Sequence, residues 1–351
     1  MFHLIVTLCL SASPATCAAR LLPAPLPETR AECESRAPAR IAGFAAAHGL
    51  TPRDWDCRTD PPAAAMTEIA PGVFSHTGAL APLSPANGGD IANLSFILTD
   101  RVTVIDAGGS RAGGEALFAA IRARTDAPIT AVILTHGHPD HSLGAAVFAE
   151  AGAEVIGHVN LPAFVAARAE TWAHSIPAQI GAAPMIGAGL VLPDRVIAVP
   201  TDLPIGQGQV LRLTPEATAH TNNDMTAFHP ASGILFTGDL VFHGLTPVLD
   251  GSLTGWLAWL ARDPGPEVAR IVPGHGHGPF GWAEGTAPIR AYLTGLADQT
   301  RAAIAAGIPM GEATAADASA LSRMPDGTPW AGFAEMHPRN ATAAYAELEW
   351  E

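Results

Sequence analysis

One stretch of 14 residues, ILTHGHPDHSLGAA at positions 133–146, constrains this chain more than any other. It places His136, His138, Asp140 and His141 directly behind an apolar run. A packed core excludes such side chains unless they are paired, and an ordinary solvated turn does not need them. Two histidines at i and i+2 of an extended segment point to the same side, and imidazoles with a carboxylate are donors that zinc selects. The loop therefore predicts a metal site.

Three later residues share this position at the end of an apolar run. They are His220 in PEATAHTNND, Asp239 in ILFTGDLVF and His275 in RIVPGHGHGP. Each is a weak signal alone, because a lone histidine or aspartate in a loop is more often solvated. Together with the four residues of the first motif they give seven donors, enough for two ions with four or five ligands each. His277, two residues after His275, could ligate in its place.

Strand-like and helix-like segments alternate along most of the chain. The run ITAVILT (129–135) predicts a strand buried on both faces, and apolar spacing predicts helices over 114–124 and 253–262. Alternation of this kind predicts sheets covered by helices. The chain has 351 residues, 48% hydrophobic and only 15% charged, which supports a compact globular protein rather than a disordered one.

The N-terminus, MFHLIVTLCLSASPATCAAR, has a short apolar stretch followed by small residues. This pattern indicates a signal peptide over residues 1–19 and a periplasmic protein, although the usual basic start is missing. The alternative is a buried first strand. Removal of the signal would leave Cys33 and Cys57, and an even pair in an exported protein predicts a disulfide between them. Two unrelated buried thiols are the alternative to that bond.

Two further segments complete the expected organisation. Residues 20–66 predict a small N-terminal appendage with a helix over 38–48, and residues 67–351 form the main domain with helices at its C-terminal end. The net charge is −14, and all 19 basic residues are arginines. This balance disfavours nucleic acid and anionic membranes as partners. No segment predicts a membrane span, so we do not expect an integral membrane protein. We expect the substrate to be a small molecule.

The motif HGHPDH, with AHT, GDLVF and PGHG downstream, resembles the metallo-β-lactamase superfamily over about residues 67–300. The resemblance implies an α/β fold of the αββα type, in which two mixed sheets pack face to face with helices outside and a dinuclear site at the sheet edge. It also implies two zinc ions per chain. The implied ligands are His136, His138 and His220 for the first ion, Asp140, His141 and His275 for the second, and Asp239 between them. Family order favours His275 over His277, and Asp106 matches a strand-end aspartate that supports the ligands.

This ligand set implies a hydrolase. A hydroxide bridging two zinc ions would attack an ester-, thioester-, lactone- or phosphodiester-type bond, with Asp140 as the catalytic residue that aims it. An aspartate at position 239 and the absence of lysine disfavour β-lactams as substrates. One alternative is a mononuclear-iron thiol or persulfide oxygenase on the same fold. Another is a non-catalytic periplasmic accessory protein that keeps the metal for structure.

A finer resemblance extends from residue 66 to the last residue. It rests on NGGDIANLSFIL, AHTNNDMTAF, GDLVFHGLTPVLDGSLTGWL, PGHGHGPFGW and FAEMHPRNATAAYAELEWE. These stretches resemble the quinoprotein relay system zinc metallohydrolases, exported proteins encoded alongside dehydrogenases that use pyrroloquinoline quinone (PQQ). The resemblance implies a role beside a periplasmic quinoprotein dehydrogenase, whose components are candidate partners. It implies no particular substrate.

Overall fold

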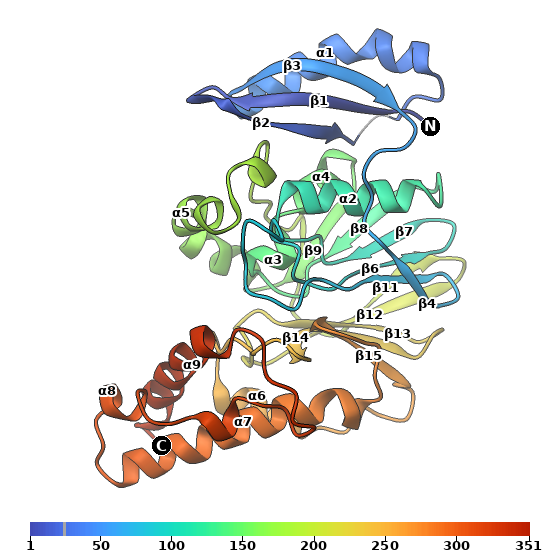
Figure 1. Cartoon of the computed structure of the whole chain (residues 1–351). Helices are drawn as coiled ribbons and strands as arrows, with labels where there is room; N and C mark the ends of the chain where they lie inside the picture. The colour runs from blue at the N-terminus through green and yellow to red at the C-terminus, as the bar shows by residue number, and fades with distance from the viewer. Residues whose placement is uncertain (24–25) are drawn as a thin grey trace.

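The computed structural model describes residues 1–23 and 26–351. Two β-sheets pack face to face with helices on both outer faces, and a smaller unit is stacked at one end of this sandwich (Figure 1). The αββα fold expected from the sequence is confirmed. No helix in the described part of the chain is long and apolar enough to cross a bilayer.

The first sheet has seven strands in the order β10-β9-β8-β7-β6-β5-β4. Their bounds are β4 (Thr67–Ala70), β5 (Val73–His76), β6 (Leu94–Leu98), β7 (Val102–Ile105), β8 (Ile129–Ile133), β9 (Glu154–His158) and β10 (Arg195–Ile197). Strands β7 to β10 run parallel, and the others pair antiparallel. The connecting helices are α2 (Arg111–Arg122), α3 (Pro139–Ser142), α4 (Ala145–Glu150), α5 (Leu161–Ile180) and the short η1 (Ala183–Met185).

The second sheet has the order β11-β12-β13-β14-β15. Its strands are β11 (Thr201–Gly206), β12 (Gln209–Pro215), β13 (Met225–His229), β14 (Ile234–Phe242) and β15 (Arg270–His275). Helix α6 (Leu253–Leu260) joins β14 to the parallel β15; α7 (Trp282–Ala305), α8 (Met310–Ala313), η2 (Ser319–Leu321) and α9 (Phe333–Leu348) follow. The carboxylate of Glu347 on α9 accepts hydrogen bonds from the N–H groups of Leu253 and Thr254, which ties α9 to the start of α6.

Three apolar layers hold the sandwich together. Ile133 of β8 and Leu213 of β12 belong to the layer between the two sheets. Phe118 of α2 belongs to the layer under the helices of the first sheet, and Trp256 of α6 to the layer under those of the second. Because both faces of β8 are covered, its sequence is apolar at almost every position.

Residues 1–23 and 26–58 form the N-terminal unit, a sheet of order β2-β1-β3 with α1 (Arg30–His48) across it. The strands are β1 (His3–Leu10), β2 (Ser13–Leu22) and β3 (Leu50–Arg58). Helix α1 begins at Arg30 rather than at Pro38, so the expected start was wrong. The cause is a cap: Oγ1 of Thr29 accepts a hydrogen bond from the N–H of Glu32, whose carboxylate accepts one from the N–H of Glu28.

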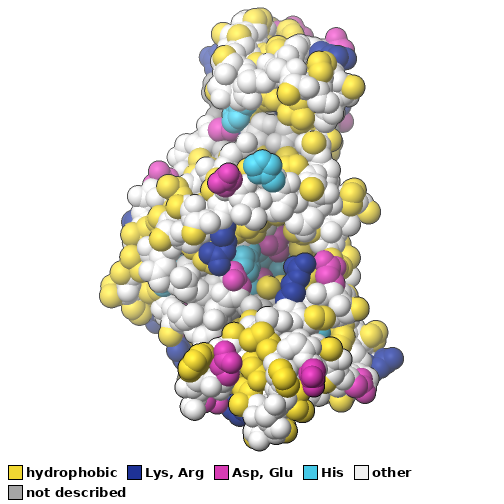
Figure 2. Space-filling model, turned by 90° about the vertical axis from the view of Figure 1, so that its left-hand side faces the viewer, with side chains coloured by type: hydrophobic (Ala, Val, Ile, Leu, Met, Phe, Trp, Pro, Cys, Tyr) yellow, Lys and Arg dark blue, Asp and Glu magenta, His cyan; other side chains and the backbone are white. Residues whose placement is uncertain are grey.

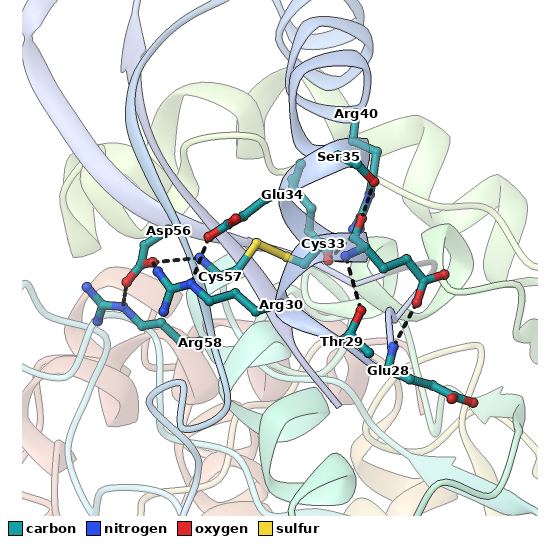
Figure 3. The surroundings of a disulfide bond; sticks show 12 residues. Glu28, Thr29, Arg30, Cys33, Glu34, Ser35, Arg40, Asp56, Cys57 and Arg58 are labelled. Carbon is teal, nitrogen blue, oxygen red and sulfur yellow. Dashed lines mark hydrogen bonds and ion pairs between the residues drawn. A yellow bond between two sulfur atoms is a disulfide. The ribbon is translucent and has the colours of Figure 1, made fainter.

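Two disulfides cross-link the N-terminal unit. Cys33 on α1 is joined to Cys57 on β3 (Figure 3), as the sequence led us to expect. Cys9 on β1 is joined to Cys17 on β2. Within the described residues no cysteine remains unpaired.

The segment expected to be a signal peptide has a defined place in this unit. Residues 1–19 form β1 and most of β2, which is the alternative of a buried first strand, and Val6 and Leu8 are fully buried. Because β1 lies between β2 and β3, cleavage after Ala19 would remove the central strand that α1 covers. The signal peptide stays a prediction.

Candidate metal centre

All seven expected ligands lie at one edge of the sandwich. His136 follows β8, His138 precedes α3, α3 carries Asp140 and His141, His220 follows β12, Asp239 lies in β14 and His275 ends β15. Their donor atoms form two groups, each within 4.8 Å: His136, His138, His220 and Asp239, called the first group, and Asp140, His141, Asp239 and His275, called the second group. Asp239 belongs to both. His277 is exposed and lies outside both groups, so the geometry selects His275.

The spacing of donors in the first group fits one ion. Nδ1 of His138 lies 2.9 Å from Nε2 of His220. Oδ2 of Asp239 lies 3.6 Å from Nε2 of His136 and 3.5 Å from Nε2 of His220. Ligands about 2.1 Å from a tetrahedral zinc ion are about 3.4 Å apart, so these distances leave room for a metal between the donors.

The second group has the same spacing. Nε2 of His141 lies 3.0 Å from Oδ1 of Asp239. Nε2 of His275 lies 3.1 Å from Oδ2 of Asp140 and 3.2 Å from Oδ2 of Asp239. Within the described structure, Nε2 of His136 is buried without a hydrogen-bond partner. A buried polar atom without a partner costs about 1–3 kcal/mol, so the donors fit divalent metal ions.

The outer nitrogen of each of four histidines is held by an oxygen. Nδ1 of His141 lies 2.8 Å from Oδ2 of Asp106, which gives Asp106 the supporting place that the resemblance implied. The other three pairs are Nδ1 of His220 with the carbonyl of Val248 at 2.7 Å, Nδ1 of His275 with the carbonyl of Ile91 at 2.8 Å, and Nε2 of His138 with Oδ2 of Asp250 at 3.0 Å. A proton on the outer nitrogen leaves the inner lone pair free for a metal.

Asp250 supports a candidate ligand, and the sequence did not reveal it. It lies 112 positions from His138 in a loop between β14 and α6. Nη2 of Arg168, on α5, lies 3.2 Å from Oδ2 of Asp250. Asp250, from the loop after β14 of the second sheet, therefore contacts both His138 and Arg168 of helix α5, which come from the half of the molecule built on the first sheet.

Two buried asparagines hold the backbone around the supporting carbonyls. Oδ1 of Asn340, on α9, accepts a hydrogen bond from the N–H of Leu249 at 3.0 Å, and its Nδ2 donates to the carbonyl of Pro247 at 2.7 Å. These two bonds bracket Val248, which supports His220. Nδ2 of Asn340 also donates to the hydroxyl of Tyr292 at 2.9 Å.

Asn93, which precedes β6, likewise holds the backbone on either side of His275. Its Nδ2 donates to the carbonyls of Pro273 at 2.9 Å and Gly276 at 2.7 Å, on either side of that histidine, and its Oδ1 accepts from the N–H of Gly78 at 3.2 Å. Neither asparagine was identified from the sequence.

The two groups differ in charge. Burial lowers the pKa of His220 to about 3 and holds that of His136 well below its ordinary value. In the second group burial acts in the same direction on His275, but the carboxylates of Asp239 and Asp140 outweigh it and raise its pKa to about 9. Burial alone would raise the pKa of Asp140, yet His141 and a hydrogen bond from His275 lower it to about 2. The carboxylate of Asp140 is therefore ionised at neutral pH.

A cavity of about 260 Å³ opens over both groups. Its floor holds His138, Asp140, Asp239 and His275; its walls include Leu83, Trp172, Ile176, Leu245 and Met336; and its polar lining includes Ser175, Gln179, Glu335 and Arg339. Figure 2 shows a hollow with histidine and acidic side chains at its bottom and basic side chains on either side. A larger cavity of about 530 Å³ lies between α7, α8 and α9, but none of the seven donors lines it.

Comparison with known proteins identifies the family. Residues 87–275, more than half of the chain, match the model of the Metallo-beta-lactamase superfamily. The chain belongs to the metallo-β-lactamase superfamily. No curated protein matches the chain.

Solved structures of the superfamily share this fold at low sequence identity. A metallo-beta-lactamase from Pontibacter korlensis is 22% identical, with a TM-score of 0.53 over 66% of this chain and 98% of that one. The inverting sec-alkylsulfatase Pisa1 from Pseudomonas sp. is 18% identical, with a TM-score of 0.61 over 81% of this chain and 50% of that one. At these identities the likeness shows the fold alone.

Proposed function

We propose that this protein is a zinc-dependent metallohydrolase that binds two zinc ions and cleaves an ester-, thioester-, lactone- or phosphodiester-type bond in a small molecule. The observation that carries the proposal is the place of Asp239, whose carboxylate belongs to both donor groups. Two ions that share one carboxylate are held close enough to act on one water molecule and one substrate. A single-iron oxygenase needs fewer ligands and does not account for seven convergent donors.

When bound, the two ions would supply a water molecule of lowered pKa and polarise the bond to be cleaved. Asp140 lies on the cavity floor, and its ionised carboxylate would accept a hydrogen bond from the attacking water and orient it toward the substrate. The apolar walls exclude other water molecules, which strengthens the electrostatic interactions within the cavity.

A panel of activated substrates from these four classes tests the proposal, and the sulfatase likeness adds a sulfate ester to the panel. We expect turnover in at least one class with both sites filled, and a loss of about 10²-fold in kcat for Asp140→Asn. Asp298→Asn, on the exposed face of α7, is the matched control and keeps wild-type turnover. No turnover in any class, or equal rates for Asp140→Asn and wild type, would favour the non-catalytic accessory role. One iron per chain by elemental analysis would favour the oxygenase.

We also propose that the protein is exported to the periplasm and serves a PQQ-dependent quinoprotein dehydrogenase system. The disulfide between Cys33 and Cys57 supports export, because such bonds persist in oxidising compartments. The resemblance of the sequence after residue 66 supports the link to quinoproteins. Cell fractionation should find the protein in the periplasm with no alkylated thiol before reduction. An intact mass that lacks residues 1–19 would confirm the signal peptide, and a full-length mass would place β1 and β2 in the mature fold.

A further inference from the structure

An arginine at the edge of the metal-site cavity has no partner. In the described part of the chain, every arginine except Arg290 and Arg339 forms a hydrogen bond or an ion pair. Arg339 lines the cavity above the donor groups, whereas Arg290, on α7, does not. The chain carries a net charge of −14, so an unpaired cation at this place is a local exception to an acidic protein.

The rest of the cavity shows what Arg339 faces. Asp140 and His275 lie at its floor, and Trp172, Ile176 and Leu245 form an apolar wall. A molecule whose scissile bond lies over the metal ligands would place its apolar body along this wall. Its far end would then reach the guanidinium, which binds oxyanions with two parallel N–H groups.

Glu335 lies one turn before Arg339 on α9 and lines the same cavity. Residues at i and i+4 of a helix are neighbours, so this carboxylate reduces the attraction of Arg339 for an anion. Within the described structure the side chains of Glu335 and Arg339 form no ion pair. The two residues therefore have opposite predicted effects on an anionic ligand.

We propose that the substrate is an organic anion with an apolar body, whose terminal oxyanion, such as a carboxylate, is bound by Arg339 while its hydrolysable bond lies over the donor groups. This inference rests on the proposed hydrolase function and adds the charge and shape of the substrate. Arg339 is a residue that determines specificity, and it lies beyond residues 87–275, the segment that the superfamily model matches.

Calorimetric binding to the zinc-loaded protein tests the inference without turnover. The ligands are N-phenylsuberamic acid, which has a terminal carboxylate, and N-phenylsuberamide, its neutral counterpart. We expect the wild type to bind the acid about three- to tenfold more tightly, as for one exposed charge-assisted contact. Arg339→Gln should bring this ratio close to one, Glu335→Gln should raise it, and Arg290→Gln, the matched control, should keep it. A preference that survives in Arg339→Gln would show that the carboxylate binds the zinc ions, and would overturn the inference.

Hydrolysis of 4-nitrophenyl hydrogen suberate and 4-nitrophenyl methyl suberate gives the second measurement. We expect a lower KM for the anionic ester, with a ratio between the two esters that collapses in Arg339→Gln and is retained in Arg290→Gln. If neither ester is cleaved while the acid still binds more tightly than the neutral amide, the proposed function fails for these esters. The proposed anion site is then retained. If both esters show the same KM in the wild type and the two amides bind equally, the anion site is overturned and the hydrolase proposal is untouched.

Discussion

Asn340 offers a sharp test of how the fold positions the metal ligands. Replacement by leucine keeps the branching and the number of side-chain heavy atoms but removes three hydrogen bonds, to the N–H of Leu249, the carbonyl of Pro247 and the hydroxyl of Tyr292. At about 1 kcal/mol for each bond, the variant should lose about 3 kcal/mol of unfolding free energy. The loop that presents the carbonyl of Val248 to His220 would then be free to move.

The effect on metal binding should be confined to the first group. Loss of a residue that supports a ligand typically weakens metal affinity by about 10–100-fold, and Asn340 acts one step further out, so we expect about tenfold. Competition with a chromophoric chelator gives the affinities. Cadmium NMR assigns them, because the first group offers three imidazoles and the second offers two.

Asn93→Leu is the matched control, because it also removes three side-chain hydrogen bonds from a buried asparagine. Its bonds surround His275, so the weakened ion should be the one in the second group. If both variants weaken both ions equally, the asparagines act only through general stability. Unchanged affinity of the first group in Asn340→Leu would refute the reasoning outright.

Two further predictions concern the metal centre. Asp239→Ala should lower the occupancy of both sites together, from about two zinc ions to fewer than one by elemental analysis; loss of one ion only would mean that Asp239 does not bridge. The ions should also differ in proton release. The pKa of His275 is raised to about 9 and that of His141 is also raised, so at neutral pH the second ion must displace protons from these imidazoles, and its affinity rises with pH up to about pH 9. The first ion should release fewer protons at neutral pH, because the pKa values of His220 and His136 are lowered. Calorimetry in buffers of different ionisation enthalpy measures both, and equal release by the two ions would contradict this account.

The donors could be predicted from the sequence and most of their supports could not. His136, His138 and His141 lie in one short motif behind a strand, so local spacing brings them together. Asp250 and Asn340 carry no such signal, because each acts across a long sequence separation and Asn340 acts on backbone atoms, which have the same chemistry at every residue.

The N-terminus shows a different limit. The apolar stretch of β1 has the composition of a signal peptide and of a buried strand alike, and only tertiary contacts with α1 and β3 distinguish the two. The start of α1 was missed although the capping sequence Thr29-Arg30-Ala31-Glu32 was present, because Pro38 indicated a first turn there.

The contacts of α9 determine when the metal centre can be completed during biosynthesis. His275, the last donor, is made well before Asn340 and Glu347, which fix the loop and the start of α6 next to the first group. A nascent chain that has exposed all seven donors therefore still lacks the helix that holds the backbone on either side of Val248, the support of His220. Stable capture of the first ion would then wait for α9 to emerge and dock, so the concentration of free metal ion where the chain finishes folding would decide its loading.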